Sequence, residues 1–436
     1  MTQVRLKKHS APLSGTLSFP GDKSLSHRAI IFGSLSEGIS SFKNVLSGED
    51  CVCTREAFEA MGVDIKSSSD GTEVVIIGKG LHGLKEPKKE LYLGNSGTSM
   101  RILSGVLAGQ PFKTTLTGDP SLSSRPMKRV TSYLRQMGAV IEGRDDGNFA
   151  PLTIKGGKLK PIDVSLAVSS AQVKSAILLA GLYANGTTSV TEPVLSRDHT
   201  ELFLRYFGAN IKQEGLKVSI AGGQTLNAKS FEIPGDISSA AFFMAIAILL
   251  KDSAIKFQNI LFNETRIGIV KVLERMGAPL MSVGHDKLGR PEMMADFSLM
   301  TQKLRGTEVM REELPSLIDE IPILCVLATQ AQGKTVIHDA DELRVKETDR
   351  IDSMITALSL MGAKIKSEKN TILIEGPTPL KGAVVDSRKD HRTAMSLIVA
   401  GLIAEGEQTV KDVDCINTSF PTFFKLLDQL KISYQL

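Results

Sequence analysis

Lysine and arginine side chains recur beside small polar residues where helices are predicted to begin. Small hydroxyl and amide residues are expected there as helix N-caps, whereas a cation near a helix N-terminus opposes the helix dipole at a cost of about 0.3–1 kcal/mol. A bound anion would reverse that cost, because free backbone N–H groups and the cations would both face it. The pattern therefore favours anion binding. Its four instances are Lys23–Arg28, Asn95–Arg101, Ser169–Lys174 and Asp390–Arg392.

For any single cation, a pairing with a nearby carboxylate or exposure to solvent is an equally good interpretation, since dipole effects are weak. The recurrence in four segments is what favours the anion site. Two further arginines belong to the same group of candidates. Arg125 precedes Pro126, which suits a first helical position, and Arg197 precedes a predicted capping box formed by Asp198 and Glu201.

The segment Glu342–Arg350 mixes cations with acids. It is typical of a solvated helix face on which Lys346 and Arg350 lie four residues apart. An Asp349 cap would instead leave Lys346 and Glu347 in the preceding loop, where sites often form. Asp319, with Glu320, could equally be an acidic helix start favoured by the dipole.

These segments belong to a repeated unit. A helix that ends in Met-Gly or Phe-Gly, followed by a short apolar strand, returns along the chain, and Gly suits the left-handed residue after a helix. Each unit reads as βαβαββ, and six units account for the chain. The repeated helix ends are Met61-Gly62, Met137-Gly138, Phe207-Gly208, Met276-Gly277 and Met361-Gly362, with a degenerate sixth at Leu430-Lys431.

The half-chain of three units is itself duplicated, because Pro20–Ser24 recurs as Pro234–Ser238, 214 residues later. We therefore predict an α/β (α+β) fold of two similar globular domains with three units each. The N-terminal domain is expected over residues 21–234. The C-terminal domain is expected to be discontinuous, with residues 1–20 joining residues 235–436.

Composition excludes several classes of protein. The chain has 436 residues and a net charge of +4, which argues against a protein that coats nucleic acid. No apolar run reaches the roughly 18 residues of a membrane span, and no secretory signal is recognisable. The four cysteines lack metal-ligand or disulfide spacing. We expect a cytoplasmic protein. The small net charge alone would suggest an uncharged partner, but the placement of the cations indicates small anions.

Two motifs with apparent chemical meaning lose their support in context. Gly78–Gly83 matches the dinucleotide fingerprint, but Pro87 and a charge run follow it instead of a helix, so we interpret it as a turn. The seven histidines show no paired ligand spacing. We therefore expect neither a nicotinamide cofactor nor a metal.

Taken together, these segments resemble the 5-enolpyruvylshikimate-3-phosphate (EPSP) synthase family over essentially the whole chain. That resemblance implies the inverse α/β barrel of the enolpyruvyl transferases and a transfer of the enolpyruvyl group from phosphoenolpyruvate to shikimate-3-phosphate. It also implies that no cofactor is required and that the protein is a monomer. The matching stretches are Pro20–Arg28, Asn95–Arg101, Arg125–Met127, Ser170–Ser175, Arg344–Arg350 and Asp390–Arg392.

The resemblance also assigns residues to roles. Asp319 matches the proton acceptor, while Lys23 and Glu347 match groups that serve proton transfer. The residues implied for shikimate-3-phosphate are Lys23, Ser24, Arg28, Ser170, Gln172, Arg197, Asp319 and Lys346. The residues implied for phosphoenolpyruvate are Lys23, Gly97, Arg125, Gln172, Arg350 and Arg392.

Two alternatives stay open at this point. A UDP-N-acetylglucosamine enolpyruvyl transferase would share the fold, but that family has a reactive Cys in the loop matching residues 109–125, where this chain has none. A non-catalytic six-repeat binding scaffold would spread its charges over a surface. One departure from the family also matters, because Thr418 stands where other members carry a Lys that contacts phosphate.

Overall fold

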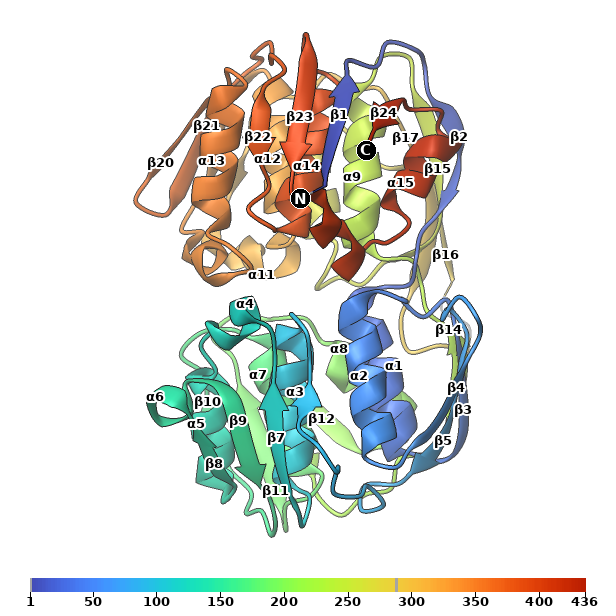
Figure 1. Cartoon of the computed structure of the whole chain (residues 1–436), viewed down its shortest axis with the longest axis vertical. Coiled ribbons are helices and arrows are strands. Elements are labelled where there is room, and N and C mark those ends of the chain that lie inside the picture. Colours follow the sequence, from blue (N-terminus) through green and yellow to red (C-terminus); the bar gives the residue numbers. More distant parts are fainter. Residues whose placement is uncertain (1, 287–288) are drawn as a thin grey trace. The chain divides into compact units, whose positions relative to one another are not determined.

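The computed structural model describes residues 2–286 and 289–436, and it resolves them into two compact units (Figure 1). The N-terminal unit comprises residues 21–233 and the short segment 289–292. The C-terminal unit comprises residues 2–20, 234–286 and 293–436. The chain thus changes units between Pro20 and Gly21 and again between Ile233 and Pro234. The assignment of segment 289–292 to the N-terminal unit was not predicted.

Each unit contains three four-stranded sheets of the same topology. The first strand pairs in parallel with the second, and the remaining pairs are antiparallel. In the N-terminal unit, the sheets in spatial order are β14 (Ser230–Glu232), β3 (Glu37–Lys43), β5 (Val74–Lys79) and β4 (Asp64–Ser67); β6 (Leu91–Tyr92), β7 (Lys113–Thr117), β9 (Phe149–Lys155) and β8 (Val140–Gly143); and β10 (Asp163–Ser165), β11 (Thr187–Thr191), β13 (Lys217–Ala221) and β12 (Ile211–Glu214).

The C-terminal unit repeats this plan with strands borrowed from the start of the chain. Its sheets are β2 (Ser14–Ser18), β15 (Ala254–Leu261), β17 (Met294–Met300) and β16 (Met281–Asp286); β18 (Glu308–Val309), β19 (Gly333–Ile337), β21 (Thr371–Gly376) and β20 (Lys364–Glu368); and β22 (Val384–Asp386), β23 (Glu407–Lys411), β1 (Gln3–Lys7) and β24 (Tyr434–Gln435). Arg5 of β1 lies opposite Thr409, and Ser14 of β2 lies opposite Ala254. The first 20 residues therefore complete two sheets of the second half.

Two longer helices accompany most of the sheets. In the N-terminal unit these are α1 (Lys23–Leu35), α2 (Glu49–Ala60), α3 (Gly97–Ala108), α5 (Lys128–Met137), α7 (Ala171–Gly181) and α8 (His199–Tyr206), with short α4 (Pro120–Ser123) and α6 (Arg144–Gly147). In the C-terminal unit they are α9 (Ile237–Leu249), α10 (Gly268–Arg275), α12 (Ile321–Gln330), α13 (Arg350–Leu360), α14 (His391–Gly401) and α15 (Phe423–Gln429), with short α11 (Leu314–Leu317), η1 (Arg311–Glu313), η2 (Asp341–Val345) and η3 (Val413–Thr418).

The first helix of each repeat forms the interior of its unit. Helices α9, α12 and α14 pack against one another (Figure 1), and residues 237–248 of α9 and 391–401 of α14 are buried on every side. In the N-terminal unit, α3 packs on α1 and α7. A Cβ at Gly105 of α3 would lie 2.2 Å from the carbonyl oxygen of Ala176, so this contact requires glycine. The sheets lie outside these helices. Because the helices are buried on every side, their sequences are nearly continuously apolar.

The predicted helix ends are confirmed by their backbone conformation. Gly62, Gly138, Gly208, Gly277 and Gly362 all have φ between 87° and 110°, the left-handed range that a glycine adopts without steric cost. Lys431, the degenerate sixth, adopts the same conformation at φ 58°. At Gly78–Gly83, the first two residues end β5 and the remainder forms a turn without a helix after it, as predicted.

Candidate active site

The start of α1 presents Lys23 as the first helical residue. Asp22 caps the helix, since its side chain accepts a hydrogen bond from the backbone N–H of Leu25 at 2.9 Å. The Lys23 ammonium forms an ion pair with the Asp50 carboxylate and stays partly exposed. A capped helix start with a partly exposed cation is suited to anion binding.

Arg28, one turn further along α1, points inward and is buried. Its Nε donates to Thr200 Oγ1 at 2.8 Å, its Nη1 to the backbone carbonyl of Ser24 at 2.9 Å, and its Nη2 to Ser175 Oγ at 3.0 Å. Burial lowers the pKa of Arg28 to about 10, against the raising effect of nearby carboxylates. This arginine fixes the backbone of Ser24 rather than reaching outward.

The starts of α3 and α7 are joined by side-chain hydrogen bonds. Arg101 Nη1 donates to Gln172 Oε1 at 2.8 Å, and Gln172 Nε2 donates to Thr98 Oγ1 at 2.9 Å. Gly97 opens α3, where an added Cβ would lie 2.9 Å from Arg101 Nη1 and 3.3 Å from Arg125 Nη1. Two guanidinium groups therefore lie directly against the backbone of Gly97. Arg101 belongs to the segment Asn95–Arg101 that was predicted to bind an anion, but it was not among the residues assigned to either substrate.

Arg125 is 8% exposed, and its guanidinium donates to Asn95, whose amide donates to Asp119 Oδ2 at 2.7 Å. The prediction that Pro126 begins a helix is wrong, because α5 starts at Lys128. Residues 125 and 126 stay in the loop, and the Pro126 carbonyl accepts a hydrogen bond from Arg101 Nη2 at 3.2 Å. The carbonyl is therefore engaged by a site arginine instead of a helix.

Ser170 caps α7, its hydroxyl accepting from Val173 N at 3.4 Å, and half-buried Arg197 precedes α8. The predicted capping box is wrong, since the Asp198 side chain makes no cap hydrogen bond and Glu201 pairs with Lys174 instead. The buried Lys174 forms ion pairs with two carboxylates, so the carboxylate interpretation holds for this cation.

In the C-terminal unit, three carboxylates surround Arg350, which is 2% exposed. Its Nε donates to Asp390 Oδ2 at 2.8 Å, its Nη2 to Glu347 Oε2 at 2.5 Å, and its Nη1 lies 3.4 Å from Asp319 Oδ1. Burial alone would lower the pKa of Arg350, but the carboxylates, Asp390 foremost, raise it above its usual value. The solvated helix face considered for Arg350 is therefore wrong.

Arg392 forms the other side of this cluster. Its Nη1 donates to the Asp319 carbonyl at 3.2 Å, and its Nε lies 3.6 Å from Asp319 Oδ1. Asp390 caps α14, accepting from Arg392 N at 2.8 Å and Thr393 N at 3.1 Å. The half-buried Asp319 side chain is thus held between two arginines. Half-buried Lys346 follows η2, ahead of the helix that Asp349 caps.

A deeper layer supports this cluster, and sequence reasoning missed it. Glu320, buried, accepts a hydrogen bond from Ser238 and lies 3.6 Å from Arg266 Nη1. Arg266 Nη2 donates to Ser238 Oγ at 2.7 Å and lies 3.5 Å from Asp236 Oδ1. Asp236 and Ser238 belong to the duplicated Pro234–Ser238 motif, which was the signal that could have drawn attention to them.

The predicted site residues are thus divided into two groups, one in each unit, and the contacts described above do not include Arg197 or Lys346. Cations, hydroxyls and amides at three helix starts form the group of the N-terminal unit. Paired carboxylates and arginines form the group of the C-terminal unit. Thr418, at the departure from the family pattern, lies in η3, where its hydroxyl donates to the Cys415 carbonyl at 2.7 Å.

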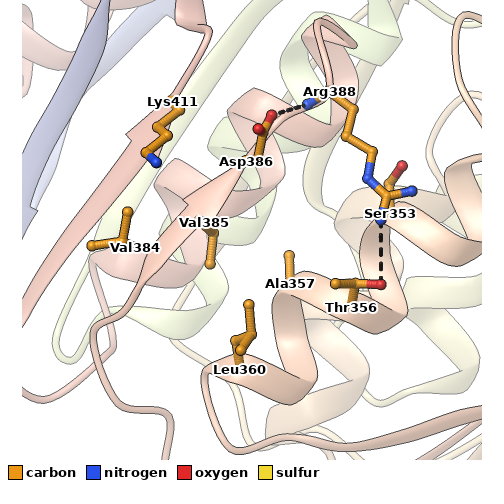
Figure 2. Close-up of a pocket in the computed structure, with 9 residues that line it drawn as sticks. All are labelled: Ser353, Thr356, Ala357, Leu360, Val384, Val385, Asp386, Arg388 and Lys411. Atoms are coloured by element: carbon orange, nitrogen blue, oxygen red, sulfur yellow. Dashed lines mark hydrogen bonds between the residues drawn. The ribbon is translucent and has the colours of Figure 1, made fainter.

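A surface pocket of the C-terminal unit is lined by none of these residues (Figure 2). It is formed between α13 and β22, with the exposed apolar side chains of Leu360 and Val384 on its wall. Arg388 at its rim is engaged by Asp352 and Thr356, at 2.5 and 3.5 Å. The pocket therefore contains none of the residues predicted to bind substrate.

Two other kinds of site are absent from the described residues. In residues 2–286 and 289–436, no group of three or more His, Cys, Asp or Glu side chains is arranged to hold a metal ion. Within the same ranges, none of the helices has the length and apolar content that a membrane crossing demands.

The chain is similar to known proteins over nearly its whole length. The chain is 50% identical, over 96% of its length and 97% of the relative's, to a 3-phosphoshikimate 1-carboxyvinyltransferase of Bacillus cereus (strain 03BB102), and 49% identical, with the same coverage, to one of Bacillus anthracis. An EPSP synthase structure from Acinetobacter baumannii matches with a TM-score of 0.89 at 43% identity, covering 99% of both chains.

The fold extends to a more distant protein. The enolpyruvyl transferase NikO from Streptomyces tendae matches with a TM-score of 0.79 at 17% identity, covering 99% of this chain and 98% of that one, which shows a shared fold alone. The predicted fold class is confirmed by these matches. The family model described as EPSP synthase (3-phosphoshikimate 1-carboxyvinyltransferase) matches residues 7–427, so the chain belongs to the EPSP synthase family.

Proposed function

We propose that this chain transfers the carboxyvinyl group of phosphoenolpyruvate to the 5-hydroxyl of shikimate-3-phosphate, releasing phosphate. The observation that carries the proposal is Asp319, a half-buried carboxylate held between Arg350 and Arg392 and separated by Arg350 from a second carboxylate, Glu347. A carboxylate beside arginines can act as a base while the arginines bind an anionic substrate.

Shikimate-3-phosphate carries a phosphate, a carboxylate and hydroxyl groups, which match the polar residues of the N-terminal unit. Ser24, Ser170 and Gln172 would hydrogen-bond the substrate, while Lys23 and Arg197 would bind its anionic groups. Arg28 would act through the Ser24 backbone that it holds. In the C-terminal unit, Asp319 and Lys346 would complete the set.

Phosphoenolpyruvate would be bound mainly by arginines. An arginine is a planar fork that can hold a phosphate or carboxylate through two hydrogen bonds, which Lys cannot do. The arginines of this subsite are Arg125, Arg350 and Arg392, and Arg350 would exchange the Asp319 or Glu347 carboxylate for the substrate. Gly97 has no Cβ, so the guanidinium groups of Arg101 and Arg125 can lie against its backbone at this subsite. Lys23 and Gln172 would contact both substrates.

The reaction balances as an addition followed by an elimination. Asp319 takes the proton of the 5-hydroxyl while the oxygen of that hydroxyl bonds to C2 of phosphoenolpyruvate. Lys23 or Glu347 protonates C3. The bond from C2 to the phosphate oxygen then breaks and phosphate leaves with the bonding pair, the deprotonated Lys23 or Glu347 takes a proton back from C3, and the C2–C3 double bond returns. No electrons are gained or lost, so the balance calls for no redox cofactor. Preorganised cations offset the repulsion between the two polyanions.

Phosphate release from phosphoenolpyruvate, with either shikimate-3-phosphate or UDP-N-acetylglucosamine as acceptor, tests the proposal. We expect release with the first acceptor only. No release with shikimate-3-phosphate would refute the function, and release only with the UDP-sugar would favour the related transferase.

Variants Lys23→Met and Asp319→Ala should lose turnover while keeping the circular dichroism of the wild type. The exposed Lys271→Met, which loses only its pair with Glu264, is the matched control and should keep full activity. A non-catalytic binding scaffold would keep its function in all three variants. We further propose that the two compact units are the two domains of the enzyme.

A further inference from the structure

Glu192 is a buried carboxylate placed directly after β11, and it ties two site loops together. Its Oε1 accepts hydrogen bonds from Ser170 N at 3.1 Å and from Ser196 Oγ at 2.6 Å. Its Oε2 accepts from Ser196 N at 3.3 Å. Since Ser170 caps α7 and Ser196 precedes Arg197, one carboxylate fixes the spacing of two segments proposed to bind shikimate-3-phosphate.

A second link joins the same two loops. The Ser169 hydroxyl donates to the Val194 carbonyl at 2.5 Å and accepts from the Val194 backbone N–H at 3.0 Å. The loops before α7 and α8 are thus held together at two adjacent points. Of these two links, the one through Glu192 is buried and charged.

Glu192 is also the end of a buried row of alternating charges. Lys174 Nζ lies 2.7 Å from Glu192 Oε2 and 2.6 Å from Glu201 Oε1, and all three side chains are at most 2% exposed. Arg28 is joined to the two helices that carry these residues, because its Nε donates to Thr200 Oγ1 at 2.8 Å and its Nη2 to Ser175 Oγ at 3.0 Å, next in the chain to Glu201 and Lys174. Burial lowers the pKa of Arg28, and the Glu201 carboxylate opposes that effect. Carboxylates and basic side chains therefore alternate from the loops to α1.

From these contacts we infer that Glu192, Lys174, Glu201 and Arg28 form a positioning network that sets the geometry of the shikimate-3-phosphate subsite. The four side chains come from the end of β11, α7, α8 and α1, the elements that carry Ser24, Ser170, Gln172 and Arg197. Glu192, Lys174 and Glu201 are not among the residues proposed to contact substrate. The inference rests on the proposed function.

Neutralising Glu192 should weaken the binding of shikimate-3-phosphate and leave the binding of phosphoenolpyruvate nearly unchanged. Glu192→Gln keeps the size of the side chain but offers Ser196 and Ser170 one acceptor oxygen instead of two, and it leaves Lys174 with a single counter-charge. We expect the KM for shikimate-3-phosphate to rise about tenfold, the scale of one charge-assisted hydrogen bond. The KM for phosphoenolpyruvate and kcat should stay within about threefold of wild type.

The test measures both KM values, kcat and direct binding of shikimate-3-phosphate by calorimetry. Gln110→Leu is the matched control, because Gln110 is fully buried and hydrogen-bonded to the Leu81 carbonyl at 3.2 Å, but follows the opposite end of α3 from Gly97. It should lower stability without the selective change in KM. Equal changes in both KM values, or a wild-type KM for shikimate-3-phosphate in Glu192→Gln, would overturn the inference.

A second variant covers a failure of Glu192→Gln to fold. Ser169→Ala removes the half-buried link, which lies outside the network but joins the same two loops. It should raise the KM for shikimate-3-phosphate about threefold, whereas an unchanged value would contradict the role that the network is given, which is to set the spacing of these loops. Glu192→Asp, which keeps the charge, should restore part of the affinity. A wild-type protein that neither binds shikimate-3-phosphate nor releases phosphate would refute the proposed function itself.

Discussion

The backbone of Gly97 lies so close to two guanidinium groups that a methyl group there must displace one of them. An added Cβ would lie 2.9 Å from Arg101 Nη1, which is shorter than carbon and nitrogen tolerate, and Arg101 is held by Gln172 and Pro126. We predict that Gly97→Ala raises the KM for phosphoenolpyruvate about tenfold with a smaller effect on shikimate-3-phosphate. Steady-state kinetics with each substrate varied would measure this.

Gly284→Ala is the control for that change, since a Cβ at Gly284 meets nothing within 4 Å. It should leave both KM values as they are. If Gly97→Ala also leaves them unaltered, the guanidinium groups have room that the contact distances do not suggest.

Arg350 is the only described side chain that touches Asp319, Glu347 and Asp390 together. A lysine has one ammonium on a flexible stem and cannot reproduce this three-way fork. We predict that Arg350→Lys lowers kcat/KM at least a hundredfold and destabilises the protein by about 3 kcal/mol, because the buried Asp390 carboxylate loses its hydrogen-bonded partner. Kinetics and urea unfolding would measure the two effects, and near-wild-type values for both would contradict the fork as its role.

At the scale of elements, α1 contains a buried histidine that should make the protein sensitive to acid. His27 donates to or accepts from Thr54 Oγ1 at 2.8 Å, and burial, followed by the charges of Lys23 and Arg28, holds its pKa well below 6.5. The unfolded chain therefore binds a proton that the folded chain refuses, so stability is complete above pH 6.5 and falls as the pH drops below it.

His27→Gln should remove this contribution, which amounts to at most about 1.4 kcal/mol per pH unit. Urea unfolding at several pH values between 7.5 and 5 gives the free energy of unfolding as a function of pH. In the variant this free energy should fall less steeply with decreasing pH, by the equivalent of about one bound proton. Identical slopes for the two proteins would mean that His27 takes up its proton in the folded state.

Local sequence signals predicted the elements better than the roles of their polar residues. The repeated glycines gave the helix ends because their left-handed conformation is a local requirement. The capping box at Asp198 failed because Glu201 is drawn into the interior by Lys174, a residue 27 positions earlier in the chain. Buried partners of this kind, including Arg266 with Glu320, depend on how sheets and helices pack and leave no periodic trace in the sequence.

At the scale of the whole molecule, the internal duplication revealed two three-sheet units, while the residues for each substrate followed only from resemblance to the family. The chain enters the C-terminal unit first, builds β1 and β2, and returns to it after Ile233. That order has a physical consequence. The C-terminal unit needs both ends of the chain, whereas the N-terminal unit is made almost entirely from one continuous stretch.

Residues 21–233 contain every strand of the three sheets of the N-terminal unit and lack only the segment 289–292, from which Glu292 reaches His199 Nδ1 at 2.7 Å. We predict that this fragment folds cooperatively and binds shikimate-3-phosphate more weakly than the full chain, because six of the eight residues proposed for that substrate lie within it. Phosphoenolpyruvate should not bind the fragment measurably, since it lacks Arg350 and Arg392. Circular dichroism during thermal unfolding and calorimetry with each substrate would measure these properties. The same fragment carrying Lys23→Met should fold equally well and lose binding, whereas a fragment that folds but ignores shikimate-3-phosphate would show that the cations of this unit are insufficient for its recognition.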